Sequence, residues 1–456
     1  MAFGTLLTLV ACALFFRSLA RIFVHPLRHV PGPIFASTSS LFLYTICYLG
    51  VEGRVIRSLH HRYRSDVLRV GPNSVSIADS SALHDIYVSG GGFPKDSRYS
   101  NFNLGPIVSI FSSTDTIYRD RRAKAVASLF APNRLRSACE HDQVIGISVS
   151  RFIHLIQEHK KERISFDLVD ICARLSIDVV TEYLLGEPYG GFREIDHLSP
   201  RDQQYHKLSA NPFIFAIVAF SRFSLLPKWL FTRVYSLSTR LASDDEVKQS
   251  FRKLDSFISG VIHTSHVFWQ QGIDPSEVAA QCKAVTFAGA DSTAVILTTI
   301  IFHLIVNPSI CRILIAQLEA HQKASTGPLD PETVPYLRAV VKEGLRLGMA
   351  NPTRLTRVVP PSTALNVEGY AIPAGTVVGC AAYTLHHDPN VFPEPFEFKP
   401  ERWIENRYDR NPLRLKMEMN MMPFGVGLRG CIGKNLAMRQ LYETISAKVR
   451  GSNSST

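Results

Sequence analysis

The chain of 456 residues has eight cysteines, but no pair has the C-x-x-C spacing of a zinc or redox motif and there is no dense cysteine framework. This pattern favours free thiols in a reducing compartment over a disulfide-stapled secreted protein. The sequence also lacks a low-complexity tract, an internal repeat and a linker rich in proline, glycine and serine. These absences favour one large domain over an array of repeats or a string of small domains.

Acidic residues are outnumbered by basic ones, which gives a formal net charge of +11 and an isoelectric point near 9.3. No basic stripe with interleaved aromatic residues is present, so binding to nucleic acid is disfavoured. The charge instead suits an anionic membrane surface or an acidic protein partner. With 46% hydrophobic residues, the chain has enough apolar side chains for a large core.

Charge is nearly missing from the N-terminus, where residues 2–16 are mostly apolar and residues 18–24 continue the run past Arg17. The whole run is about long enough to span a bilayer if the Arg17 side chain reaches to the interface. Arg21 and Arg28 follow and no basic residue precedes the run, so the positive-inside rule places the body in the cytosol. Residues 1–24 are therefore predicted to be a single-pass anchor in the endoplasmic reticulum membrane.

A cleaved signal peptide is the alternative for this segment, with residues 18–20 as the cleavage site. The charged region that opens such a signal is missing, which favours the anchor. Pro31, Gly32 and Pro33 are expected to end the helix. We predict a proline-rich hinge over residues 25–33 and one globular domain over residues 34–456.

A glycine-rich segment near the C-terminus, residues 424–433, matches the pattern F-G-x-G-x-R-x-C-x-G at every specified position. Gly425 and Gly427 permit a tight turn with positive φ, and Arg429 supplies a cation that could hold a carboxylate. Backbone N–H groups around Cys431 would stabilise its thiolate, the ligand that pushes electron density into heme iron. The alternative is an ordinary buried cysteine beside a glycine-rich turn, which the full match to the pattern disfavours.

A long central helix is predicted over residues 275–306. Asp274 suits the N-cap, Pro275 the first position and Glu277 the third, and Asn307 with Pro308 ends the pattern. At 1.5 Å per residue such a helix is about 45 Å long, enough to cross a whole domain.

The middle of this helix reads Ala-Gly-Ala-Asp-Ser-Thr over residues 288–293. The three small residues would let a planar cofactor approach, and Ala288 and Ser292 share a helix face. Asp291 followed by the alcohols of Ser292 and Thr293 could relay protons, which heterolytic cleavage of an O–O bond requires. The alternative is a tight helix crossing with a solvated aspartate.

Another helix begins at Pro335 and carries Glu343 and Arg346 at i,i+3 spacing, which places acid and base on one face. Residues 400–403 read Pro-Glu-Arg-Trp and include Arg402. Short β-like segments are predicted near residues 67–77 and 365–378, so the expected fold class is mainly α with a small β region.

In order and spacing, these segments resemble the cytochrome P450 superfamily, the heme-thiolate monooxygenases. The resemblance implies the cytochrome P450 fold, heme b as cofactor and Cys431 as the axial ligand of the heme iron. It implies that Asp291, Ser292 and Thr293 serve proton delivery, although Ser292 stands where the family usually has threonine.

The same resemblance implies that Glu343, Arg346 and Arg402 form an internal scaffold rather than a catalytic group. It implies cofactor contacts by the following residues: Arg122, Arg357, Phe424, Arg429 and Gly433. Within this set Arg122 follows from a weaker match, because Tyr118 occupies the position where the family has histidine or tryptophan. A solvated basic helix face is the alternative for Arg122.

The implied activity is oxidation of a lipophilic small molecule with O2. Electrons would come from NADPH through a separate NADPH–cytochrome P450 reductase, since no flavin or dinucleotide motif is present. The motif sequences resemble fungal enzymes of secondary metabolism related to pisatin demethylase, which implies a terpenoid, polyketide or alkaloid substrate. The alternative is a general lipid or xenobiotic oxidase. Residues 212–231 are apolar enough for a membrane-dipping access channel, or equally for a buried core helix.

The C-terminus departs from the family pattern. A helix is expected after Cys431, running through Leu436 to about Lys448, and residues 451–456 are small and polar. The resemblance implies a further β-hairpin that lines the substrate pocket, so we expect this chain to lack that wall and to bind substrate weakly. Two alternatives follow: a heme-binding protein with little turnover, and a reductase-independent heme-thiolate isomerase or dehydratase.

Overall fold

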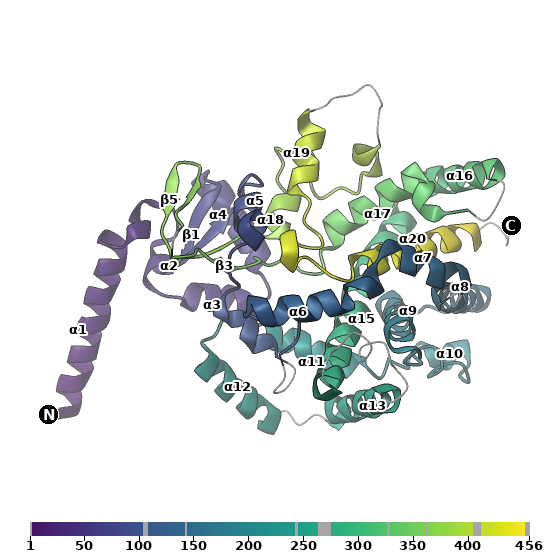
Figure 1. The fold of residues 1–456 in the computed structure, drawn as a ribbon, viewed down its shortest axis with the longest axis horizontal. Helices are drawn as coiled ribbons and strands as arrows, with labels where there is room; N and C mark the ends of the chain where they lie inside the picture. The colour runs from purple at the N-terminus through teal and green to yellow at the C-terminus, as the bar shows by residue number, and fades with distance from the viewer. Residues whose placement is uncertain are drawn as a thin grey trace.

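The computed structural model describes residues 2–103, 108–141, 144–241, 245–262, 275–325, 329–361, 363–404 and 412–451. Helices dominate it (Figure 1). The first half of the chain forms these helices: α1 (Ala2–Phe23), α2 (Ile34–Thr38), α3 (Leu41–Tyr48), α4 (Glu52–Tyr63), α5 (Ala82–Tyr87), α6 (Thr116–Ala127), α7 (Pro132–His141), α8 (Val144–Glu162), α9 (Leu168–Leu185), α10 (Pro200–Gln203) and α11 (Asn211–Ser221). The second half adds α12 (Lys228–Leu241), α13 (Asp245–Ile262), α15 (Pro275–Val306), α16 (Pro308–Ala324), α17 (Pro335–Gly348), α18 (Ala382–His386), α19 (Pro412–Asn420) and α20 (Lys434–Gly451).

The β structure is small, as predicted. Its strands are β1 (Val67–Gly71), β2 (Ser74–Ile77), β3 (Arg357–Val358), β4 (Leu365–Val367), β5 (Tyr370–Ile372) and β6 (Val377–Gly379). Four of them form a sheet in the order β1-β2-β6-β3, in which β2 and β6 are parallel and the other neighbours antiparallel, while β4 and β5 form a hairpin. The sheet therefore joins the N-terminal part of the chain to the segment that follows α17.

Helix α1 projects from the body at the left of Figure 1, and its apolar side chains are exposed rather than packed. Phe16, for example, is 67% exposed. The end of α1 is nevertheless fixed to the body, because the Arg69 guanidinium donates to the Arg21 carbonyl at 2.9 Å. The helix ends at Phe23, before Pro31 and Pro33, which were expected to end it. A 3-10 turn over Pro26–His29 follows.

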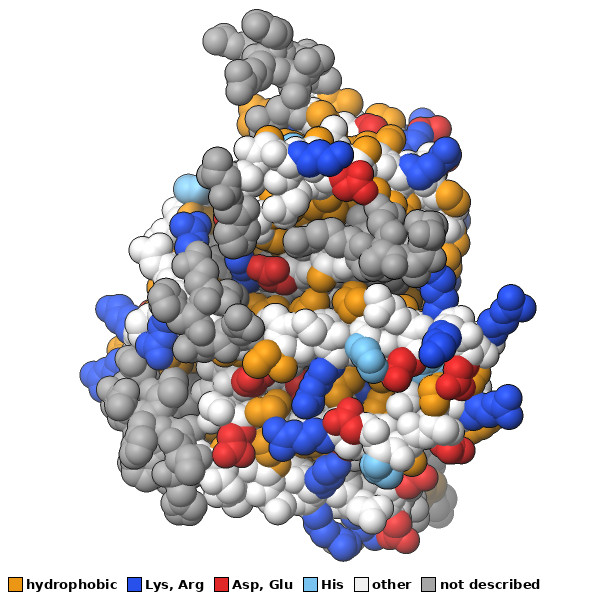
Figure 2. Space-filling model, turned by 90° about the vertical axis from the view of Figure 1, so that its right-hand side faces the viewer, with side chains coloured by type: hydrophobic (Ala, Val, Ile, Leu, Met, Phe, Trp, Pro, Cys, Tyr) orange, Lys and Arg blue, Asp and Glu red, His pale blue; other side chains and the backbone are white. Residues whose placement is uncertain are grey.

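The face of the molecule turned away from α1 carries lysine and arginine side chains intermingled with aspartate and glutamate (Figure 2). Such a mixed surface is typical of protein that faces water. The contrast with α1 gives the molecule an apolar end and a polar end.

The apolar segment over residues 212–231 divides between α11, a turn and the start of α12. Phe213 and Ile214 are buried, while Phe215 is 60% and Trp229 62% exposed. The two interpretations of this segment thus each describe part of it, because α11 anchors in the core while its other face and α12 are uncovered.

The predicted helix over residues 275–306 is confirmed as α15, which lies centrally in Figure 1; its predicted N-cap, Asp274, is outside the described residues. A β-carbon at Gly289 would lie 2.6 Å from Val180 Cγ2 on α9, so this glycine allows the two helices to cross closely. Residues 277–306 of α15 are long and apolar enough to cross a membrane. Because Leu297, Ile300 and other residues of α15 are fully buried in the main core, this helix is a core helix.

Candidate functional site

The cysteine loop adopts the tight turn that its glycines predict. Gly425 and Gly427 have φ of 69° and 71°, in the left-handed region. A β-carbon at Gly427 would lie 1.8 Å from the Tyr87 carbonyl oxygen, so no other residue fits there without moving α5. The loop closes where the backbone N–H of Cys431 donates to the Phe424 carbonyl at 2.8 Å.

The Cys431 thiol is open to solvent although protein surrounds much of it. Its side chain is exposed, yet burial by surrounding protein raises the pKa of the thiol. The backbone N–H groups of Gly433 and Lys434, at the start of α20, donate to the sulfur and offset part of this rise. A β-carbon at Gly433 would stand 3.9 Å from Cys431 Sγ, so glycine keeps the space beside the sulfur open.

The middle of α15 presents one open face. Ala288 is exposed although it lies halfway along the central helix, and Ser292 Oγ donates to the Ala288 carbonyl at 2.6 Å. Gly289 contacts Val180 and Ala290 is fully buried, so only one of the three small residues faces the open side. The tight helix crossing is present at Gly289, while Ala288 leaves another side of the same turn open.

The acid of this motif is half-buried. Burial raises the pKa of Asp291, and no described residue forms a hydrogen bond or ion pair with its carboxyl group. Thr293 is 5% exposed and points into the core, away from the open face that Ala288 and Ser292 share. Asp291 and Ser292 are therefore the two members of the motif that can exchange protons with an open space.

A cluster of cations lies beside the cysteine loop. Arg357 on β3 is 3% exposed, and Arg429 in the loop donates to the Ser113 carbonyl at 3.4 Å and to Thr116 Oγ1 at 3.2 Å. Sequence reasoning missed two further members, Lys95 and Arg119. Both are more than 90% buried, and the charges of Arg119 and Arg357 lower the pKa of Lys95 and of Arg429.

Arg122 is directed elsewhere. Its Nε donates to Glu277 Oε2 at 2.6 Å, its Nη2 also contacts Glu277, and its guanidinium lies 3.3 Å from the centre of the Tyr118 ring. These contacts join α6 to the first turn of α15. In this arrangement Arg119, three residues earlier on α6, is the arginine that approaches Arg429.

The three scaffold residues meet in the interior. Arg346 donates through Nε and Nη2 to both oxygens of Glu343 at 2.8 Å, and Arg402 Nε donates to Oε1 of the same carboxylate at 3.0 Å. Glu343 and Arg346 are 0% exposed. Burial alone would raise the pKa of Glu343, but the hydrogen bonds and charges of the two arginines outweigh it and hold the pKa below its usual value.

Hydrogen bonds lead from this scaffold to the cysteine loop. The Arg346 carbonyl accepts from His386 Nδ1 at 3.0 Å, and His386 Nε2 accepts from the Met422 N–H at 3.0 Å. Burial lowers the pKa of His386 to about 3, so the ring is neutral with its proton on Nδ1. The Met422 carbonyl in turn accepts from the Gly425 N–H.

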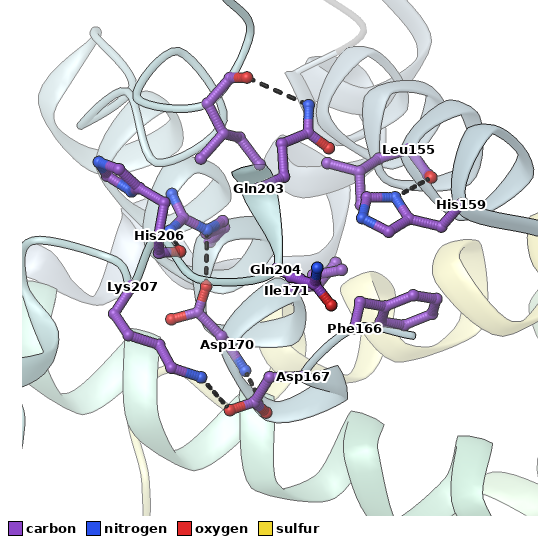
Figure 3. A pocket seen from close by; sticks show the side chains of 12 residues that line it. Leu155, His159, Phe166, Asp167, Asp170, Ile171, Gln203, Gln204, His206 and Lys207 are labelled. Carbon is purple, nitrogen blue, oxygen red and sulfur yellow. Dashed lines mark hydrogen bonds and ion pairs between the residues drawn. The ribbon is translucent and has the colours of Figure 1, made fainter. Parts of the chain in front are cut away.

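A separate small cavity lies between α8, α9 and the segment that follows α10 (Figure 3). Its walls carry the Asp170–Arg174 ion pair, and His159 Nε2 and Gln203 Oε1 are buried there without a partner among the described residues. At about 10 Å³ the cavity is the size of a single water molecule. It is therefore too small for an organic substrate, and none of the residues that line it belongs to the cysteine loop.

The sequence profile of the cytochrome P450 family matches residues 54–447. The chain belongs to the cytochrome P450 family. It is 55% identical to the cytochrome P450 monooxygenase mfmF of Annulohypoxylon moriforme, over 94% of this chain and 90% of that protein. It is 30% identical to the cytochrome P450 monooxygenase hkm5 of Aspergillus hancockii, over 93% of this chain and 84% of that protein.

More distant relatives agree with this assignment. The N-acetyltryptophan 6-hydroxylase ivoC of Emericella nidulans is 26% identical over 98% of this chain and 90% of that protein. The crystal structure of cytochrome P450 CYP102L1 superposes with a TM-score of 0.65 and 14% identity over 87% of each chain. The cytochrome P450 fold and the class of enzyme, a monooxygenase, are thus as the sequence motifs predicted.

Membership of the cytochrome P450 family implies a heme-iron cofactor, and the residues of this chain fit one. The accessible Cys431 thiol supplies the soft ligand, anionic once it is deprotonated, and the exposed Ala288 leaves room on the central helix. The cationic cluster also needs anions, because no described carboxylate lies within ion-pair distance of Arg357, Arg429 or Lys95.

Proposed function

We propose that this cytochrome P450 binds heme b through Cys431 and oxidises a lipophilic small molecule. The single observation that carries the proposal is the exposed Cys431 thiol whose sulfur accepts from the backbone N–H groups of Gly433 and Lys434. These donors stabilise the thiolate and moderate its electron donation, which is the arrangement that heme-thiolate chemistry requires. When bound, heme supplies the iron at which O2 is reduced and one oxygen atom is transferred to the substrate.

The cations beside the loop would hold the heme carboxylates. Arg357 and Arg429 were proposed from the sequence, and the positions of Lys95 and Arg119 support adding them. We propose Arg119 in place of Arg122 on α6, because Glu277 already binds the Nε and Nη2 edge of the Arg122 guanidinium and Nη1 donates to the Tyr118 carbonyl. Phe424, half-buried against the main core, and Gly433 would contact the cofactor from the cysteine side.

Asp291 and Ser292 are proposed to deliver protons. A carboxyl group whose pKa is raised by burial holds a proton nearer to neutral pH, which suits a general acid. Ser292 Oγ donates to the Ala288 carbonyl in the present arrangement, and a rotation about χ1 would free its proton. Thr293 is buried and is proposed to support this turn of the helix rather than to transfer protons.

The proposal extends to the source of electrons, the attachment to a membrane and the class of substrate. Electrons would come from NADPH through a cytochrome P450 reductase. The exposed apolar side chains of α1, together with Trp229 on α12, favour attachment to the endoplasmic reticulum membrane with the body in the cytosol. The similarity to named fungal monooxygenases favours a role in secondary metabolism, with a terpenoid, polyketide or alkaloid as substrate.

The test is replacement of the ligand. Cys431→Ala should abolish the long-wavelength absorption band of the reduced carbon monoxide complex, because no other residue in the loop can supply a thiolate. The half-buried Cys311 on α16 gives the matched control, and Cys311→Ala should keep the band. A Cys431→Ala protein that retains the band would refute the assignment. Product formation without any reductase would instead support the isomerase or dehydratase alternative.

A further inference from the structure

Lys95 occupies an unusual position for a lysine. It is 9% exposed, and among the described residues its Nζ donates to one acceptor, the Phe111 carbonyl, at 2.5 Å. The rings of Tyr99 and Phe111 lie beside the nitrogen at 4.4 Å and 4.8 Å from their centres and stabilise a cation in part. An ammonium group has three protons to share, and in the described part of the chain the Phe111 carbonyl is the one hydrogen-bond acceptor, so the ammonium form is only partly satisfied here.

The charges around Lys95 are mostly of its own sign. Burial first, and then the charges of Arg357, Arg429 and Arg119, lower the pKa of Lys95 to about 6. The acidic residues of the adjoining elements have other partners: Asp96 pairs with Arg98, Asp120 pairs with Arg119, and Asp115 accepts from the backbone N–H groups of Ile117 and Tyr118. The charges of Asp115 and Asp120 raise the pKa of Arg429, but neither carboxylate is among the causes that shift the pKa of Lys95.

We propose that Lys95 takes up a proton when a heme carboxylate enters the cationic cluster, so that heme binding by this chain consumes a proton at this residue. This inference rests on the proposed heme-binding function. The cluster adjoins the cysteine loop, because Arg429 belongs to the loop that carries Cys431. An anion placed among Arg357, Arg429 and Lys95 supplies the missing counter-charge and makes the ammonium form of Lys95 favourable.

The sign of the pH dependence follows from linkage. Proton uptake on binding means that affinity for heme is highest below pH 6, where Lys95 is already protonated, and falls as pH rises towards the higher pKa of the heme-bound state. One coupled proton changes the dissociation constant by about tenfold per pH unit within that range. Thiolate formation at Cys431 releases a proton and acts in the opposite direction, so the contribution of Lys95 must be isolated by comparing variants.

The experiment measures how heme partitions between the heme-loaded chain and apomyoglobin from pH 6.0 to 8.5, for wild type, Lys95→Arg and Lys95→Met. Lys95→Arg keeps a permanent cation, so the ratio of wild-type to Lys95→Arg dissociation constants should rise about tenfold per pH unit above pH 6. Lys95→Met should bind heme more weakly, and its pH profile should be parallel to that of Lys95→Arg. Lys124→Met, at an exposed lysine of α6, is the matched control and should follow wild type.

Two outcomes separate the possible failures. Parallel pH profiles for wild type and both Lys95 variants, with normal thiolate spectra in all of them, would overturn proton uptake by Lys95 and leave the heme assignment intact. Wild-type protein that never gives the thiolate spectrum would refute the heme assignment itself. Circular dichroism at each pH shows whether a variant has remained folded, and the conservative Lys95→Arg variant keeps the test decisive if Lys95→Met is unstable.

Discussion

At the scale of the residue, the proposed proton delivery depends on two neighbouring side chains of α15, Asp291 and Ser292. Ser292→Ala removes the hydroxyl beside Ala288, and Asp291→Asn removes the only acid on that turn. Both variants should keep heme binding and slow product formation by about 10²–10⁴-fold, the usual contribution of general acid catalysis. Reducing equivalents should then appear as peroxide, which is measured together with product and NADPH consumption.

Thr299 provides the control for this prediction, because its Oγ1 donates to the Val295 carbonyl at 2.8 Å in the same way, two turns further along α15. Thr299→Ala should leave the ratio of product to NADPH unchanged. If the Ser292→Ala, Thr293→Ala double variant also keeps wild-type coupling, proton delivery by this motif is refuted.

At the scale of the element, α17 depends on an interaction that is costly to break. Arg346→Ala would leave the fully buried carboxylate of Glu343 with fewer donors, at a cost of about 3–5 kcal/mol. That is a large part of the stability of many domains, so we expect Arg346→Ala not to accumulate as folded, heme-loaded protein. Expression level, heme content and the thermal midpoint measure this.

Arg338 is the matched control, since it is an exposed arginine on the same helix. Arg338→Ala should fold and bind heme as wild type does. Recovery of soluble, heme-loaded Arg346→Ala with an unchanged thermal midpoint would show that the Glu343 network is peripheral to folding.

Local signals in the sequence were enough to predict several elements. The apolar length of residues 275–306 and the Asn307-Pro308 stop predicted α15 and its C-terminal end, and the two β-like segments became five strands of the two sheets. The turn at Gly425 and Gly427 follows from the preference of glycine for positive φ. These features depend on residues close together in the chain.

Features that depend on distant segments could not be predicted in this way. Lys95 and Arg119 join Arg357 and Arg429 only because the folded chain brings four separate segments together. The requirement for glycine at position 289 comes from Val180 on another helix. A single lysine beside Pro94, or an arginine next to Asp120, has no local pattern that marks it as part of a binding site.

At the scale of the whole molecule, the apolar α1 and the mixed-charge opposite face predict a fixed orientation at a membrane. Helix α1 has 22 residues and is about 33 Å long, close to the hydrocarbon thickness of a bilayer. Deletion of residues 2–24 should move most of the protein from the membrane pellet to the soluble fraction, as measured by fractionation after a carbonate wash.

Ile313→Lys, at an exposed apolar position on α16, is the control and should not change the distribution. A truncated protein that still pellets completely with membranes, while remaining folded and heme-loaded, would show that α1 is not the anchor.

The hydrogen bonds through His386 have a consequence for how the molecule comes apart. Because this ring joins the Arg346 carbonyl to the Met422 N–H, the buried ion pairs and the cysteine loop cannot separate without breaking a buried contact. The loop is short and has little core of its own, so it should not open ahead of the region that supports it. Release of the cofactor and loss of the helical core should therefore occur together on heating, as one cooperative transition.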